Sequence, residues 1–231
     1  MSNIEIEIIA FHGWGLSGDF WAPWQKLIPP SIELRCANRG YFGKSSMEKF
    51  RQAKSHKIVM LHSFGLHWCP PDLISEADHL IIFSGFVDFH PVEDDAKRRS
   101  KLILQQMMGR FIEEPEETLL KFYENLFYPE SRAWDPPVRM NHERLLEDLN
   151  RINNPRTSLE SLRKIPSITL LHGEMDTIVS NKNARNLFHS LRFQCQYFEI
   201  KQAGHALPYT HARQCSKLIL SKLQKLEEEN V

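Results

Sequence analysis

Ser63 occupies the kind of position in which a catalytic serine is expected. It follows the apolar run Ile58-Val59-Met60-Leu61 and belongs to the segment His62-Ser63-Phe64-Gly65. This pattern predicts a strand that runs into a sharp turn. Such a turn lifts a hydroxyl above the edge of a parallel sheet, where a base reaches it from one side and a substrate carbonyl from the other. The sequence therefore predicts that Ser63 is the nucleophile of an acyl-transfer reaction.

An acid and a base follow in two later segments. Residues 170–176 form a predicted strand and a turn that carries Asp176, and Ala203-Gly204-His205-Ala206 forms a predicted turn that carries His205. In a triad, His205 would take the serine proton and later deliver it to the leaving group. Asp176 would orient the imidazole and stabilise its cation. The chain order Ser, Asp, His is one of the known orders of such a triad.

Other residues compete for these roles. Glu174 and Asp88 are alternative acids, but the spacing from Gly173 favours Asp176. Cys69 is an alternative nucleophile without the strand-and-turn context, and a free cysteine is most often a buried apolar residue. Taken singly, the three triad residues also fit ordinary turn, cap or surface positions. Their occurrence in order at predicted strand ends is what favours a catalytic triad.

A tetrahedral intermediate needs two hydrogen-bond donors for its oxyanion. The backbone N–H of Phe64 directly follows the predicted nucleophile, and that of Trp14 lies in the turn His12-Gly13-Trp14-Gly15 after the first strand. The glycines on either side of Trp14 allow this turn to approach the nucleophile closely. Trp14 and Phe64 are therefore the predicted backbone donors of an oxyanion hole.

The elements that must hold these residues alternate between short apolar runs and longer helical patterns. This alternation predicts an α/β fold with a mostly parallel, doubly wound sheet of about six strands. The predicted strands are 4–11, 32–37, 57–61, 79–84, 167–172 and 196–200, and the helices between or after them include 17–28, 180–191 and 208–227. The first of these helices has Ser17 as its expected N-cap.

The strand pattern stops between Phe86 and Ile165, where prolines interrupt helical segments. We therefore predict a core made of residues 1–87 and 166–231 and a helical lid made of residues 88–165. A lid in this place would cover the carboxyl ends of the strands and hence the nucleophile. Most apolar residues of the lid are expected to pack internally, whereas Met107 and Met108 are expected to contact an acyl chain. His62 is expected to line the mouth of the substrate pocket.

Composition limits the class of protein. The 231 residues contain 29 Lys and Arg and 29 Asp and Glu, a balance that argues against a nucleic-acid surface. The four cysteines are scattered without metal-ligand spacing, so neither a metal, a cofactor nor a disulfide framework is expected. Residues 1–7 lack the basic start and apolar core of a signal peptide, and no apolar run is long enough for a membrane span. A cytoplasmic enzyme that does not bind membranes is expected.

Two features depart from the usual Gly-x-Ser-x-Gly turn. Leu61 occupies the first glycine position, where its side chain needs additional room. Pro70-Pro71 follows Ser63 closely, so the helix behind the nucleophile is expected to end early or to kink.

The four segments around residues 12–15, 62–65, 172–176 and 204–206 together resemble the α/β-hydrolase superfamily across nearly the whole chain. Within it, the chain looks most like the pimeloyl-[acyl-carrier protein] methyl ester esterases of biotin synthesis, including cyanobacterial forms. The tryptophan of the first turn and the segments 106–109, 143–149 and 203–206 carry this likeness. The resemblance implies hydrolysis of a methyl ester on a pimeloyl chain carried by acyl carrier protein, with release of methanol.

An acidic carrier protein would need basic residues near the pocket mouth. The family presents basic lid residues to its carrier, and Lys97 and Lys101 match the first such pair, with Arg98 between them. Glu114 and Thr118 stand where further basic residues would be expected. Two alternative functions remain open: an esterase or thioesterase that does not use a carrier, and a non-catalytic binding protein with the same fold.

Overall fold

A six-stranded parallel sheet forms the centre of the molecule. The computed structural model describes residues 5–154 and 157–229, with side chains described through residue 221. The strands have the order β2-β1-β3-β4-β5-β6, and every neighbouring pair is parallel. The strands are β1 (Ile6–Phe11), β2 (Glu33–Cys36), β3 (His56–His62), β4 (His79–Phe83), β5 (Ser167–Gly173) and β6 (Cys195–Ile200). The prediction of a parallel sheet of about six strands is therefore confirmed.

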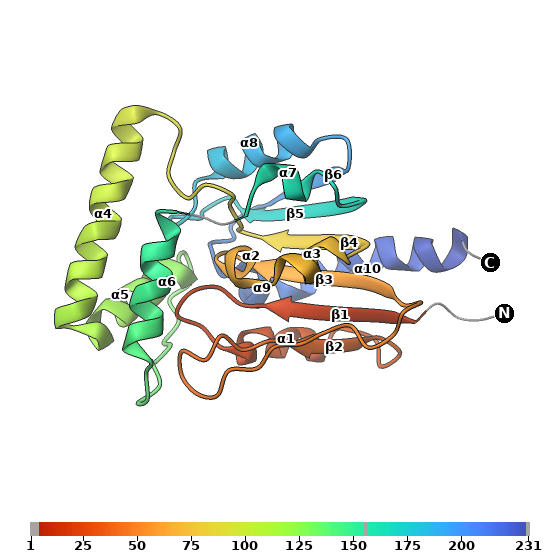
Figure 1. Ribbon diagram of the computed structural model, residues 1–231, viewed down its shortest axis with the longest axis horizontal. Coiled ribbons are helices and arrows are strands. Elements are labelled where there is room, and N and C mark those ends of the chain that lie inside the picture. Colours follow the sequence, from red (N-terminus) through yellow and green to blue (C-terminus); the bar gives the residue numbers. More distant parts are fainter. Residues whose placement is uncertain (1–4, 155–156, 230–231) are drawn as a thin grey trace.

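Helices cover both faces of this sheet and one of its ends (Figure 1). They are η1 (Gly18–Trp21), α1 (Ala22–Gln25), α2 (Gly65–Trp68), α3 (Pro71–Ser75), α4 (Asp94–Glu113), α5 (Pro115–Phe127), α6 (His142–Ile152), α7 (Leu159–Leu162), α8 (Asn181–Leu191), α9 (Leu207–Thr210) and α10 (Ala212–Glu229). In Figure 1, α2 and α3 lie in front of the sheet and α10 lies behind it, as a doubly wound sheet requires.

The strand order reverses direction between β1 and β3. The chain leaves β1 toward β2 on one side, whereas β3 to β6 follow one another on the other side. In open parallel sheets the crevice outside the carboxyl ends of the strands at such a switch point is the usual ligand site. The turn that begins at His12 and the turn that carries Ser63 leave the sheet on the two sides of this point.

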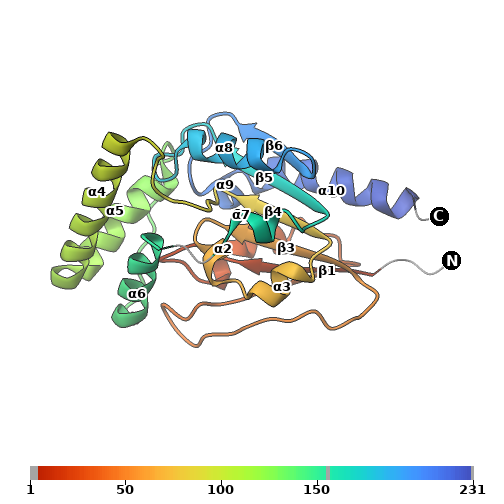
Figure 2. The same ribbon diagram turned by 45° about the horizontal axis from the view of Figure 1, so that its top comes forward.

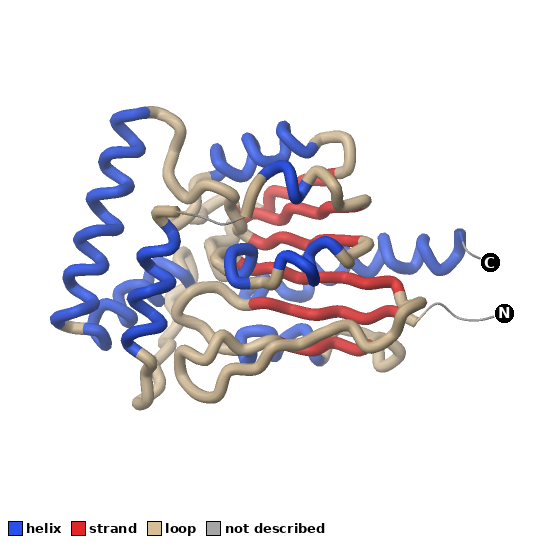
Figure 3. The backbone as a smooth tube through the Cα atoms, viewed as in Figure 1, coloured by secondary structure: helices blue, strands red, loops and turns tan. Residues whose placement is uncertain are grey.

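The three longest helices of the predicted lid stand at one end of the sheet. In Figures 1 and 2, α4, α5 and α6 lie together beyond the ends of the strands, away from both termini. The short helix α7 also belongs to the range 88–165 but lies alongside the sheet in these views. Figure 3 shows a long loop segment joining β4 to α4.

Two of the predicted helices are divided. The range 17–28 forms η1 and α1 because Pro23 has no N–H with which to continue a helix across this point. Ser17 accepts a hydrogen bond from the Asp19 N–H as the expected N-cap. The range 208–227 is interrupted at His211, between α9 and α10.

The core is continuous from the sheet into the lid. Strand residues such as Ile8 and Ile81 are buried together with Leu119 of α5 and Leu145 of α6. Their burial away from water supplies the main stabilisation that holds the lid on the sheet. Within the part of the chain that the structure describes, no helix has the length and apolar character needed to cross a bilayer.

Candidate active site

Ser63 sits on a tight turn between β3 and α2. Its backbone φ is 52°, a left-handed conformation that non-glycine residues seldom adopt, and its N–H donates to the carbonyl of Phe83 at 2.9 Å. Gly65 is required here because a Cβ at this position would come within 2.5 Å of the Phe11 carbonyl oxygen. Leu61 is fully buried in register between Phe11 and Ile82, so the turn forms with leucine at its first position.

The helix behind this turn is short, as predicted. α2 ends at Trp68, Cys69 is extended, and α3 begins at Pro71. Proline lacks the amide hydrogen that would continue α2, so the chain changes direction here.

The turns after β3, β5 and β6 bring the three predicted triad residues into contact. The Oγ of Ser63 lies 2.9 Å from Nε2 of His205, and Nδ1 of His205 lies 2.8 Å from Oδ2 of Asp176. A carboxylate accepts from an N–H, so His205 carries its proton on Nδ1. Its Nε2 is then free to accept the proton of Ser63. The imidazole is 1% exposed, which keeps competing water away from both hydrogen bonds.

The environment of Asp176 keeps its carboxylate ionised. Burial alone would raise its pKa, but the charge and hydrogen bond of His205, together with backbone donors, lower the pKa to about 2. Its Oδ1 accepts the N–H groups of Ile178 and Val179, each at 2.9 Å. The carboxylate is therefore ionised, and its two oxygens are held by the His205 ring and by the two backbone donors.

His172 is a neighbour of the triad that the sequence analysis did not assign. Its Nε2 donates to the Val179 carbonyl at 2.9 Å and lies 3.3 Å from Oδ2 of Asp176. Burial lowers the pKa of His172, so it contacts the acid as a neutral group. It lies near the carboxyl end of β5, directly before Gly173, a position that could have indicated this role.

The two predicted oxyanion donors are buried and uncommitted. The Phe64 and Trp14 residues are 1% and 3% exposed. Among the hydrogen bonds of the described residues, neither backbone N–H donates to another protein group. A Cβ on Gly13 would lie 3.2 Å from Cβ of Ser63, which shows how closely this loop approaches the nucleophile. Two free amide donors beside a serine hydroxyl are what an oxyanion hole requires.

Helix α5 covers the loops that carry the site. The hydroxyl of Tyr123 donates to the Gly15 carbonyl at 2.7 Å, and the N–H of Ala206 donates to the Leu126 carbonyl at 2.9 Å. α5 thus joins the loop that carries Trp14 to the loop that carries His205. Beneath this cover, Ser63 is only 8% exposed.

His62 does not lie at the mouth of a pocket, where the sequence analysis placed it. It is fully buried, its ring stacks on Phe20 at 4.7 Å, and its Nε2 donates to the backbone carbonyl of His205 at 3.0 Å. Burial holds its pKa well below the ordinary value, so it is neutral. The imidazole points into the protein because the His205 carbonyl accepts its N–H. This hydrogen bond also helps to hold the loop that carries His205.

The predicted pocket and docking residues lie on α4. Met107 and Met108 are half-buried against the hydrophobic core. Lys97 is half-buried, Arg98 and Lys101 are exposed, and Arg98 pairs with Asp95. Contact with an acyl chain or a carrier protein stays a prediction for all five of the lid positions that the sequence analysis singled out.

Two cavities lie beside the loop that carries Arg39. One of about 150 Å³ is bordered by Ser45, Trp68 and Arg144, and one of about 660 Å³ by Trp68, Arg151 and Lys164. Neither of these two cavities is lined by a triad residue.

The alternative acids and the alternative nucleophile do not take part in the hydrogen-bonded series of Ser63, His205 and Asp176. Glu174 accepts from the Gln202 N–H and Asp88 is exposed, while both ring nitrogens of His205 are occupied by Ser63 and Asp176. Burial raises the pKa of the Cys69 thiol well above its ordinary value, which disfavours the thiolate that a nucleophile needs. Within residues 5–154 and 157–229, no group of three His, Cys, Asp or Glu side chains is arranged to hold a metal ion.

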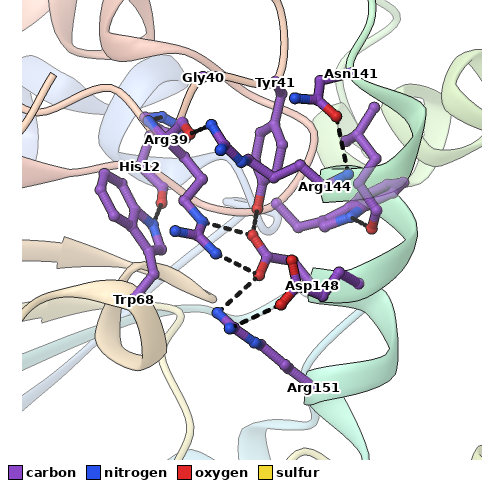
Figure 4. A network of polar contacts seen from close by, with 12 residues as sticks. His12, Arg39, Gly40, Tyr41, Trp68, Asn141, Arg144, Asp148 and Arg151 are labelled. Atoms are coloured by element: carbon purple, nitrogen blue, oxygen red, sulfur yellow. Dashed lines mark hydrogen bonds and ion pairs between the residues drawn. The ribbon is translucent and has the colours of Figure 1, made fainter. Parts of the chain in front are cut away.

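A second buried polar cluster lies next to the oxyanion loop (Figure 4). Asp148 of α6 is fully buried and accepts hydrogen bonds from Arg39, Tyr41 and Arg151. The sequence analysis assigned none of these residues a role. A signal was present, because Asp148 falls on the apolar stripe of α6 with Leu145 and Ile152, where an unpaired carboxylate would be unfavourable.

Comparisons with known proteins establish the fold. No protein-family model matches the sequence, and no curated protein matches it. Among solved structures, an esterase from Thermogutta terrifontis has a TM-score of 0.74 at 14% identity, over 98% of this chain and 92% of that chain. A bromoperoxidase from Bacillus anthracis has a TM-score of 0.77 at 17% identity, over 96% and 93% of the two chains.

An enol-lactonase from Burkholderia xenovorans LB400 has a TM-score of 0.75 at 14% identity, over 96% of this chain and 92% of that chain. These similarities extend over nearly the whole of both partners. The chain therefore has the α/β-hydrolase fold, as predicted.

Proposed function

We propose that this protein is a serine hydrolase that cleaves carboxylic esters. The observation that carries the proposal is the hydrogen-bonded series Ser63–His205–Asp176 beside two uncommitted backbone N–H groups. Structures with the same fold include proteins described as esterases, which agrees with this chemistry.

The geometry supports a two-step acyl transfer. Oγ of Ser63 attacks the ester carbonyl while Nε2 of His205 takes its proton, and Asp176 stabilises the imidazolium. The N–H groups of Trp14 and Phe64 stabilise the oxyanion. The C–O bond to the alcohol then breaks, and His205 returns the proton to the leaving alcohol. Water, deprotonated by His205, cleaves the acyl-serine in the same way and releases the acid.

The finer proposal is that the ester is the methyl ester of a pimeloyl group on acyl carrier protein, cleaved in the cytoplasm during biotin synthesis. The sequence resemblance and the basic positions Lys97, Arg98 and Lys101 on the lid support it. The products would be methanol and the pimeloyl carrier with a free carboxylate.

A fluorophosphonate probe tests the hydrolase proposal directly. The wild type should be labelled covalently, and Ser63→Ala should abolish the labelling while the protein stays folded. Labelling that persists in Ser63→Ala, or a folded wild type that neither labels nor hydrolyses esters, would contradict the proposal. The latter result would favour a non-catalytic binding protein.

A substrate panel tests the finer proposal. Pimelate methyl ester linked to acyl carrier protein should be cleaved faster than the free ester, and Lys97→Glu with Lys101→Glu should reduce only the carrier-linked rate. Equal rates on both would favour an esterase that does not use a carrier, and preference for an acyl thioester would favour a thioesterase. Expression of the gene should also restore growth without biotin in a strain that lacks the methyl esterase.

A further inference from the structure

We propose that Asp148 is a positioning residue for the reaction: it holds Arg39 so that the backbone of Arg39 fixes His12, and His12 aims the Trp14 N–H at the oxyanion. This inference rests on the proposed ester hydrolysis and assigns part of its geometry to the lid. Figure 4 labels the first three residues of this connection, Asp148, Arg39 and His12.

The first step joins the lid to the loop after β2. Nε and Nη2 of Arg39 donate to Oδ2 and Oδ1 of Asp148 at 2.7 and 2.8 Å, a two-bond pairing that fixes the guanidinium plane. The Tyr41 hydroxyl donates to the same carboxylate at 2.8 Å. On the same helix, Nη1 of Arg144 donates to the Arg39 carbonyl at 3.0 Å. Arg39 is thus held by α6 through both its side chain and its backbone.

The second step joins Arg39 to the ring of His12. The backbone N–H of Arg39 donates to Nε2 of His12 at 3.0 Å. A backbone N–H can only donate, so Nε2 is the unprotonated nitrogen of the ring and Nδ1 carries the proton. Burial lowers the pKa of His12 to about 4, which keeps the ring in this neutral form near pH 7.

In the third step, the protonated Nδ1 of His12 fixes the direction of the Trp14 N–H. Nδ1 of His12 donates to the Gly13 carbonyl at 2.8 Å. This carbonyl and the Trp14 N–H belong to one planar trans peptide, in which the two groups point in opposite directions. Fixing the Gly13 carbonyl therefore fixes the direction of the Trp14 N–H.

The side chain of Trp14 makes a second contact with the same lid helix. Its Nε1 donates to the Leu145 carbonyl of α6 at 2.8 Å. Trp14 is thus tied to α6 twice, through the series that starts at Asp148 and directly through the Leu145 carbonyl. Asp148 and Leu145 are both buried residues of α6. The oxyanion donor is correctly aimed only while α6 is seated on the core.

The test compares Asp148→Asn, His12→Gln and the double variant with Glu143→Gln, a control that neutralises an exposed carboxylate on the same helix. Turnover of p-nitrophenyl butyrate is measured per active site, with sites counted by complete fluorophosphonate labelling. We expect Asp148→Asn to lower kcat about ten- to a hundredfold with KM changed less than about twofold. Glu143→Gln should match the wild type. A trifluoromethyl ketone, whose adduct has an oxyanion, should bind more weakly by about the same factor as kcat falls.

The double variant separates a connected series from two independent effects. If Asp148 acts through His12, the double variant should be no slower than His12→Gln alone. A wild-type kcat per labelled site in Asp148→Asn, accompanied only by a lower melting temperature, would overturn the proposal, as would losses that multiply in the double variant.

Failure of the proposed function would appear differently, as absence of labelling and turnover in the wild type. The ring nitrogens of His12, observed by NMR, then still test the connection. The wild type should show the proton on Nδ1, and Asp148→Asn should show a mixture of tautomers. An unchanged His12 signal in Asp148→Asn would overturn the role of Asp148.

Discussion

Two carboxylates with fully buried side chains, Asp176 and Asp148, have different kinds of partner. Asp176 contacts the imidazoles of His205 and His172 and two backbone N–H groups. Asp148 contacts two guanidinium groups and a phenol. Each carboxylate joins segments that are far apart in the chain.

The difference in partners separates two tasks. An imidazole can gain and lose a proton near neutral pH, so a carboxylate beside it can support proton transfer. A guanidinium stays charged at all ordinary pH values, so a carboxylate beside it can only hold geometry. The first cluster is therefore suited to the chemistry and the second to the placement of the groups around it.

The largest expected effect is on the rate in Asp176→Asn. The asparagine would favour the wrong tautomer of His205, and kcat should fall by about 10⁴-fold. The folded protein lowers the pKa of Asp176 from 3.8 to about 2, and a neutral asparagine loses the stabilisation that this shift represents. The free energy of unfolding should therefore fall by about 2 kcal/mol or less. Ester turnover and urea denaturation measure the two quantities. A fall in kcat below tenfold in a labelled, folded variant would show that another acid acts.

Asp148→Asn should lower stability more, and kcat less, than Asp176→Asn does. It leaves the largely buried guanidinium of Arg39 without its countercharge, so the free energy of unfolding should fall by about 3–5 kcal/mol. The accompanying loss in kcat should stay far smaller than that of Asp176→Asn. Equal losses of stability in the two variants, measured in the same denaturant series, would remove the distinction between the clusters. Glu143→Gln serves as the control.

A buried imidazole outside both clusters, that of His67, predicts how the stability of the protein responds to acid. Burial lowers the pKa of His67 to about 4 from an ordinary value of 6.5. Between these values the unfolded chain binds more protons than the folded protein. The free energy of unfolding should therefore fall as the pH drops from 6.5 to 4, and this contribution should be fully present above pH 6.5. At about 1.4 kcal/mol per pH unit, His67 alone contributes up to about 3 kcal/mol to this loss.

His67→Phe isolates this contribution. A phenyl ring is close in shape to the buried imidazole of His67 and cannot take up a proton, so it can fill this place without titrating. The variant should unfold less readily than the wild type at pH 4.5 and show a shallower pH dependence. Replacing the exposed His189 by Gln should change neither. An unaltered pH slope in His67→Phe would show that the ring is not neutral when folded.

Tyr41→Phe should have the smallest effect. It removes one neutral donor from Asp148 while the paired contact with Arg39 remains. Stability should fall by about 1 kcal/mol, and kcat should change less than in Asp148→Asn. Chemical denaturation and ester turnover provide the check. A loss as large as that of Asp148→Asn would mean that the phenol, and not the ion pair, holds the loop.

Most of the sheet could be predicted from local pattern. Each of the six predicted strands has a counterpart in the structure, and the described ends differ by two residues at most. Apolar runs bounded by turn residues are sufficient for this, because buried parallel strands are apolar on both faces. The divided helices were missed because Pro23 and the bend at His211 interrupt patterns that otherwise satisfy helical spacing.

The triad candidates were also visible in the chain, since each stands directly after a strand and the carboxyl ends of parallel strands meet at one edge. The positions of His62 and Asp148 were not visible in this way. The sequence shows an imidazole beside the nucleophile and a carboxylate on a helix, but their partners are the His205 carbonyl and the Arg39 guanidinium.

Those partners are 143 and 109 residues away in the chain. Local spacing therefore specifies which residues end each strand and so which ones can react. Whether a buried polar group faces a pocket or a distant backbone is decided only when the lid and the core pack together, because burial forces each polar atom toward whichever partner the packing supplies.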